Sequence, residues 1–229
     1  MRILLVGEYS NLHNSLQKGL QELNHEVLLI RIGDGFKKYK SDILIKTPFK
    51  SGFLKKVNSL FVKIFKLDLH SIYTFLIIKK YKDDLKGYDI VQYINESPFL
   101  CTPDFEIKIF NFLKKQNKKS FLLSCGTDYT SVKYAYDKRF KYSILTPFFE
   151  NKISEEQFFP ILKYLTPSYK KLHEHLLKNI EGVIASDLDY HLPLLNHPKY
   201  LVLIPNPVNI SNFDYNRILI KYQNRNNFF

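Results

Sequence analysis

Cysteine is scarce in this sequence, which has only Cys101 and Cys125 among its 229 residues. These two residues form neither a disulfide framework nor the spacing of a metal site, so we expect a reducing, cytoplasmic environment and no bound metal.

Long apolar runs are also missing. Arg2 is followed by only four apolar residues, which is too few for a secretory signal peptide. No run approaches the roughly 20 residues that a membrane-spanning helix needs.

The glycine-rich motifs that cradle phosphate groups are absent as well. Gly7 follows an apolar run, but Glu8 and Tyr9 come next, so the pattern G-x-G-x-x-G is missing and a nicotinamide-dinucleotide site is not expected. No G-K-[ST] follows, which excludes a P-loop. Gly7 on its own is typical of a turn glycine, with Ser10 or Asn11 as the cap of the following helix.

The sequence does contain a regular alternation of strand and helix patterns. Apolar runs at residues 3–6 and 27–32 flank an amphipathic stretch with leucines at helical spacing, which predicts a strand, a helix and a second strand. Such a unit leaves a crevice at the carboxyl ends of its parallel strands, where ligands usually bind. Further strands are expected at residues 42–45, 89–94, 120–124, 182–185 and 200–204.

This alternation predicts an α/β fold, a Rossmann-like parallel sheet of about seven strands with helices on both faces. We expect one domain over residues 1–210 and a linker or tail over residues 211–229. Two insertions interrupt the rhythm. Residues 52–80 predict one or two helices, and residues 130–166 predict irregular helices over the mouth of the crevice.

The charge is strongly basic and unevenly distributed. The chain carries 34 Lys and Arg against 22 Asp and Glu, a net charge of +12, and the window 37–86 alone holds thirteen lysines and four aspartates, a net charge of +9. Such clustering suggests an anionic partner. Residues 53–65 have the spacing of a basic amphipathic helix, which is typical of an anionic membrane surface. The other interpretation is a helix whose apolar face covers the sheet. The lysines concerned are Lys55, Lys56, Lys63 and Lys66.

Polar clusters follow three of the expected strands directly. Residues 95–98, 125–128 and 186–187 all lie where a parallel sheet forms its crevice, so we expect them to converge on one ligand site. Glu96 and Asp128 could orient sugar hydroxyls, or one of them could act as a general base. Gly126 would let a ligand approach the backbone closely.

Two other groups are weaker candidates. His173 and His175 resemble a metal pair, but residues two apart on a helix point to different faces. Cys125 after an apolar strand is more often a packed small residue than a nucleophile.

Taken together, these motifs resemble one family. The chain is similar to the N-terminal half of a GT-B glycosyltransferase, and most of all to the family 4-like group, over about residues 1–213. Residues 1–27 look like that family's first strand, glycine loop and helix. The segment 125–128, Cys-Gly-Thr-Asp, is similar to the family's His-Gly-x-Asp, with cysteine in place of histidine.

Two later segments strengthen the resemblance. Residues 181–186 resemble the strand that ends in serine before the next helix. Residues 204–209, with Phe213 downstream, resemble the Pro-Asn-Gly-Val-Asp segment that leads towards the donor domain. The order of the motifs and this last segment carry the resemblance.

The resemblance implies an acceptor-binding half of an enzyme that transfers a sugar from a nucleotide-sugar to a cell-surface polysaccharide or glycolipid acceptor. It implies no cofactor in this chain, a nucleotide-sugar donor for the intact enzyme, and a donor domain in the same protein or a partner, without which activity is low. The expected site has Glu96 and Asp128 as catalytic residues and Gly7, Glu8, His13, Asn95, Cys125, Gly126, Thr127, Ser186 and Asn206 as substrate-binding residues.

An alternative stays open, namely a non-catalytic Rossmann-like module that docks on a membrane or a partner subunit. Nucleic acid is not an expected partner, because the aromatic residues do not interleave with lysines in a known motif. In either case, we expect a cytoplasmic protein, with a peripheral position on the inner face of the cell membrane as one option.

Overall fold

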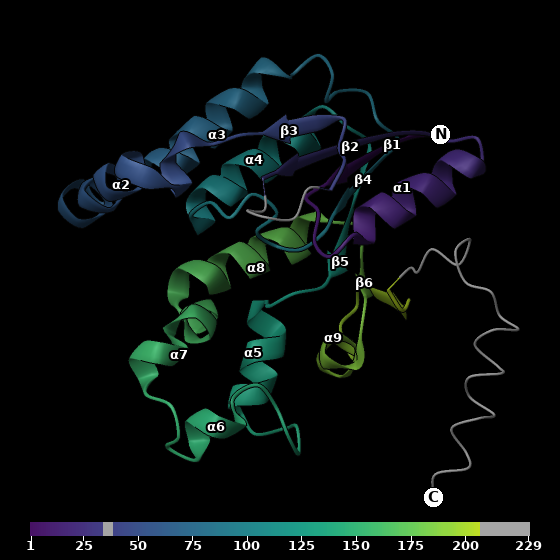
Figure 1. Ribbon diagram of the computed structural model, residues 1–229. Helices are drawn as coiled ribbons and strands as arrows, with labels where there is room; N and C mark the ends of the chain where they lie inside the picture. Colours follow the sequence, from purple (N-terminus) through teal and green to yellow (C-terminus); the bar gives the residue numbers. More distant parts are fainter. Residues whose placement is uncertain (34–38, 207–229) are drawn as a thin grey trace, which may run out of the picture.

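The computed structural model describes residues 1–33 and 39–206, and these form a seven-stranded parallel sheet in the order β3-β2-β1-β4-β5-β6-β7 (Figure 1). The predicted Rossmann-like α/β fold is confirmed. The strands are β1 (Arg2–Val6), β2 (Glu26–Ile32), β3 (Ile43–Ile45), β4 (Ile90–Tyr93), β5 (Lys119–Ser124), β6 (Gly182–Ala185) and β7 (Tyr200–Leu203). Every neighbouring pair is parallel.

Helices connect the strands in the described part of the chain. They are α1 (Leu12–Glu22), α2 (Gly52–Phe65), α3 (Leu69–Lys80), α4 (Pro103–Lys115), α5 (Tyr129–Tyr136), α6 (Thr146–Phe149), α7 (Glu155–Leu162), α8 (Pro167–Asn179) and α9 (Leu188–Leu194). Short 3-10 helices cover Pro48–Lys50 and Lys163–Leu165. Within residues 1–33 and 39–206, none of these helices is long and apolar enough to cross a membrane.

Alternating side chains of the strands build two apolar layers. In β1, Leu4 and Val6 join the larger core, which also contains side chains of α3, α4 and α8. Ile3 and Leu5 point to the opposite face and pack against Leu16 of α1. Figure 1 shows α1 on one side of the sheet and α3, α4 and α8 on the other. The central strands are buried on both faces, which explains their nearly continuous apolar sequences.

Both insertions are helical. The first forms α2 and α3, and the second forms α5 to α7, which surround a small core of their own at Val132, Ala135 and Leu145. Because all strands are parallel, the loops that carry the expected site and the starts of both insertions lie at the same edge of the sheet. This edge is therefore where the structure concentrates its polar loops.

The cap of α1 differs from the sequence prediction. Ser10 and Asn11 both have left-handed backbone angles, and Asn11 makes no capping hydrogen bond with its side chain. Glu8 takes this role, since its Oε2 accepts a hydrogen bond of 2.7 Å from the backbone N–H of Asn14. The predicted boundary at residue 210, the tail 211–229, and Val208, Asn209 and Phe213 of the last motif lie outside the described residues.

Candidate functional site

Buried acidic and polar side chains converge at the carboxyl ends of β1, β4 and β5, which are neighbours in the sheet. Glu8 follows β1, Glu96 follows β4 and Asp128 follows β5, and their exposed fractions are only 4%, 2% and 4%. Asn95 and Ser97 lie beside Glu96, and Asn95 Oδ1 accepts a hydrogen bond of 2.9 Å from the backbone N–H of Ser97. The polar residues that the sequence places after these strands therefore lie at one edge of the sheet.

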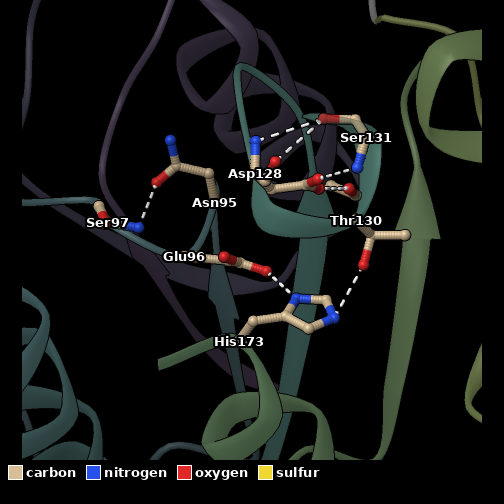
Figure 2. A network of polar contacts seen from close by, with 8 residues as sticks. Asn95, Glu96, Ser97, Asp128, Thr130, Ser131 and His173 are labelled. Carbon is tan, nitrogen blue, oxygen red and sulfur yellow. Dashed lines mark hydrogen bonds and ion pairs between the residues drawn. The ribbon is translucent and has the colours of Figure 1, made fainter. Parts of the chain in front are cut away.

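His173 of α8 links Glu96 to α5 (Figure 2). One ring nitrogen, Nδ1, forms a very short hydrogen bond with Glu96 Oε1, and the other, Nε2, lies 2.8 Å from Thr130 Oγ1. Carboxylate, imidazole and hydroxyl thus form one chain of hydrogen bonds across three elements. The sequence singled out His173 only as one of a pair with His175. His175 instead bonds Asn111 Oδ1 at 2.8 Å, away from Glu96.

The Glu96–His173 pair holds a proton more firmly than the separate side chains would. Burial raises the pKa of Glu96, and the neighbouring His173 only partly offsets this. Burial alone would lower the pKa of His173, but the charge of Glu96 and its hydrogen bond outweigh burial and raise that pKa. A pair that retains a shared proton can accept one from, or return one to, a bound hydroxyl group.

Asp128 has a different environment. Its Oδ1 accepts the backbone N–H of Ser131 at 2.7 Å, which caps α5, and its Oδ2 accepts the hydroxyl of Ser124 at 2.5 Å. Both carboxylate oxygens of Asp128 are therefore engaged by this chain. The geometry makes Asp128 an organiser of the loop after β5, with Glu96 as the carboxylate that has an oxygen to spare.

Three buried oxygen atoms of the cluster lack a partner among the residues that the structure describes. They are Glu8 Oε1, Glu96 Oε2 and Ser97 Oγ. A buried acceptor without a hydrogen bond costs about 1–3 kcal/mol, so native structures rarely leave such an atom without a partner. A ligand rich in hydroxyl groups would supply the missing donors. The sequence indicated Glu8 and Glu96, but could not show that each keeps one oxygen free.

Gly7 and His13 shape the loop after β1. Gly7 has a φ of +86°, and a Cβ atom there would lie 2.3 Å from Ile94 Cγ2 and 2.7 Å from Pro98 Cβ. His13 Nδ1–H donates to Gly7 O at 2.7 Å, and burial lowers the pKa of His13 to about 4, so its ring is neutral. Gly7 thus lets this loop pack against the loop after β4, and His13 fixes the loop from the side of α1.

The remaining predicted residues lie at or near the same edge. Cys125 is buried, its thiol donates to Ile94 O at 3.1 Å, and burial raises its pKa to about 12, which makes it a packed thiol. Ser186 is buried and donates to Ser124 O at 2.8 Å. Gly126 is exposed with a φ of +68°. Asn206 lines a small, mainly apolar cavity beside α1, together with His13.

A larger cavity of about 390 Å³ opens beside the polar cluster. Thr127, the residue before Asp128, lines it, and it extends between α5, the loop before α6 and the start of α9. Its lining combines aromatic, hydroxyl and carboxylate side chains, as in pockets that recognise polar ligands. The polar and aromatic lining residues are Thr127, Ser131, Phe140, Tyr142, Ser143, Asp189 and Tyr190. Tyr142, Asp189 and Tyr190 were not predicted, because they follow no strand directly.

No three His, Cys, Asp or Glu side chains come together as a metal site within residues 1–33 and 39–206. Glu106 of α4 is a further buried carboxyl that the sequence did not reveal. Its Oε1 accepts the backbone N–H groups of Phe99 and Cys101 at 3.3 and 2.8 Å. Burial raises the pKa of Glu106 from 4.5 to about 8, and these hydrogen bonds offset this only partly. Glu106 thus fixes the loop that follows Pro98.

Replacing Glu106 by glutamine should stabilise the protein at alkaline pH. The raised pKa means that the Glu106 carboxyl contributes its full stability below about pH 4.5, and that this contribution is lost as the pH rises towards 8. Glutamine keeps the accepting oxygen and never ionises. We expect equal free energies of unfolding at pH 4.5 and a variant more stable by roughly 4–5 kcal/mol at pH 9, measured by urea titration. A difference in the free energy of unfolding that is the same at pH 4.5 and at pH 9 would contradict a raised pKa of Glu106.

No protein-family model and no curated protein matches this sequence. Among solved structures, one described as an NADH-flavin reductase from Streptococcus pneumoniae has 18% identity, covers 81% of this chain and 71% of its own, and gives a TM-score of 0.37. The structure of Os79 from O. sativa in complex with UDP has 8% identity, covers 97% of this chain and 57% of its own, and gives a TM-score of 0.49. A UDP-glucosyltransferase from Polygonum tinctorium capable of glucosylating indoxyl has 12% identity, covers 96% of this chain and 55% of its own, and gives a TM-score of 0.39. The chain thus spans just over half the length of the last two proteins.

Proposed function

We propose that this chain is the acceptor-binding domain of a glycosyltransferase that acts on a cell-surface polysaccharide or glycolipid. The observation that carries the proposal is the group of buried oxygens without partners among the described residues, Glu8 Oε1, Glu96 Oε2 and Ser97 Oγ. A 390 Å³ cavity lies at the same edge of the sheet and is lined by Thr127 and Ser131, which flank Asp128 in the sequence. Sugar acceptors present hydroxyl groups to carboxylates and apolar ring faces to aromatic side chains. The crevice and the cavity offer both kinds of contact.

In this proposal, Glu96 takes the proton of the attacking acceptor hydroxyl at Oε2. His173 and its hydrogen bond to Glu96 Oε1 stabilise the charged carboxylate before the transfer. The acceptor oxygen then bonds to the anomeric carbon as the bond to the nucleoside diphosphate breaks. In line with the resemblance to the GT-B family, we propose that a second domain or a partner subunit would hold the nucleotide-sugar and form the other wall of the site.

Binding of oligosaccharides tests the cavity. Replacing Tyr142, whose ring is 75% exposed at the cavity, by alanine should weaken acceptor binding about tenfold through the loss of a stacking surface. We would screen cell-surface oligosaccharides and lipid-linked sugars by saturation-transfer NMR and then measure the dissociation constant of the best ligand by calorimetry. Tyr81, an exposed tyrosine after α3 and outside the cavity, is the matched control.

The two tyrosine variants give opposite expectations. Tyr81→Ala should bind the ligand like the unchanged protein. If no sugar in the panel binds, or if both variants bind equally well, the acceptor site is not in this cavity.

A further inference from the structure

Helix α2 is an outer helix with an unusually open apolar side. It spans Gly52–Phe65, and none of its 14 residues is buried. It packs against the 3-10 helix before it and against α3, and only Val57, Asn58 and Phe61 are half-buried. Figure 1 shows α2 at the left edge of the molecule, below α3. The prediction of a helix is confirmed, but most of its apolar side chains do not cover the sheet.

The exposed apolar side chains of α2 form a row. Phe53, Leu60 and Ile64 are spaced by seven and four residues, which places them on one face of the helix. Their exposed fractions are 77%, 55% and 58%. Phe65, the last residue of the helix, and Leu67 just after it continue the apolar surface, with exposed fractions of 58% and 48%. Such a continuous row is more than the scattered apolar residues of an ordinary surface.

Four lysines accompany this row. Lys56 and Lys63, seven residues apart, lie on one face beside the row, whereas Lys55 lies on nearly the opposite side of the helix and Lys66 follows its last residue. All four are exposed, and α2 contains no acidic residue. In the part of the chain that the structure describes, none of the four forms an ion pair with a carboxylate. The helix thus presents apolar groups and uncompensated positive charge side by side.

The position of α2 relates this surface to the crevice. Strand β3 ends at Ile45, and α2 begins seven residues later, so its start lies at the carboxyl edge of the sheet. The crevice opens at the same edge.

We propose that α2 binds the surface of an anionic lipid bilayer. The row at Phe53, Leu60 and Ile64 enters the boundary between headgroups and acyl chains, and Lys56 and Lys63 beside it contact lipid phosphates. A symmetric contact with a second copy fits less well, because it would bring two sets of uncompensated lysines together. This surface lies outside the crevice, so its test is independent of the transfer proposed above.

Vesicle flotation of the full chain tests the proposal. At moderate salt, the protein should float with vesicles of phosphatidylcholine containing roughly one-third phosphatidylglycerol, and not with phosphatidylcholine alone. Replacing Lys55, Lys56, Lys63 and Lys66 together by glutamine should reduce the bound fraction about tenfold. Replacing Leu60 and Ile64 by serine should do the same through the loss of apolar insertion. Circular dichroism should show unchanged folding, because every substituted residue is exposed.

The matched control removes the same charge elsewhere. Lys18, Lys115, Lys119 and Lys152 are exposed on other elements, and their replacement by glutamine should leave most binding intact. If both lysine variants lose the same fraction of vesicle binding, binding depends on overall charge and α2 is not the membrane-binding surface. The absence of any binding to anionic vesicles would also overturn the proposal. A dimer in light scattering that dissociates in the Leu60→Ser/Ile64→Ser variant, without vesicle binding, would assign the surface to a second copy.

Discussion

Replacing Gly7 by alanine should lower the free energy of unfolding by about 3 kcal/mol or more. Two costs add together. The φ of +86° is strained for any residue with a side chain, and the new Cβ would lie 2.3 Å from Ile94 Cγ2 and 2.7 Å from Pro98 Cβ. Ile94 is fully buried and Pro98 has a rigid ring whose Cα is also close, at 3.3 Å, so neither neighbour can move aside cheaply.

Gly19 provides the matched control for this substitution. It lies inside α1, and a Cβ atom there would meet nothing within 4 Å. Gly19→Ala should therefore raise the free energy of unfolding by about 0.5–1 kcal/mol, because alanine favours the helix. Urea titrations of both variants measure these changes in the free energy of unfolding. A Gly7→Ala protein as stable as the parent would show that the loops after β1 and β4 are not locked together.

Replacing His173 by alanine should lower the free energy of unfolding by about 3–5 kcal/mol near neutral pH. Glu96 would remain buried at 2% exposure with no cationic partner and with a lost hydrogen bond at Oε1. Burial already raises the pKa of Glu96, and the loss of His173 would raise this pKa further. The carboxyl would stay protonated to higher pH at the expense of folding stability.

The raised pKa of Glu96 determines the pH at which the substitution of His173 lowers stability most. For a carboxyl whose folded pKa is raised, stability is fully present below the unfolded pKa of about 4.5 and is lost as the pH rises. The His173→Ala variant should therefore be closest to the parent near pH 4.5 and weakest near pH 8, as measured by urea titration at both values.

A double variant separates the pair from simple packing. Glu96→Gln/His173→Ala removes the stranded charge, so it should be more stable near pH 8 than His173→Ala alone. If the effects of the two substitutions simply add, the pair is not coupled and Glu96 does not depend on His173.

Local patterns predicted the framework well, for a physical reason. Each strand of a parallel sheet is a short apolar run, and each is followed by turn residues, so the pattern at residues 182–185 coincides with β6. The polar residues after the strands could be located in the same way. Parallel topology then brings Glu8, Glu96 and Asp128 to one edge without further information.

Contacts between distant parts of the chain could not be predicted in this way. Glu96 and His173 are 77 residues apart, and only the packing of α8 against the sheet joins them. The helical pattern of residues 53–65 was clear, but a pattern alone does not decide which face a helix buries. Glu8 as the cap of α1 was missed because the backbone after Gly7 is left-handed at two successive residues, Ser10 and Asn11.

The central claim is that an acceptor sugar binds in the crevice at the carboxyl ends of β1, β4 and β5 and in the adjoining cavity. Backbone amide NMR during titration with the best-binding oligosaccharide tests this most directly. We predict that the amide signals of Ser97, Thr127 and Tyr190 shift together and saturate with one affinity, while those of α2 stay unchanged. Saturating shifts confined to residues away from this edge of the sheet would contradict the account.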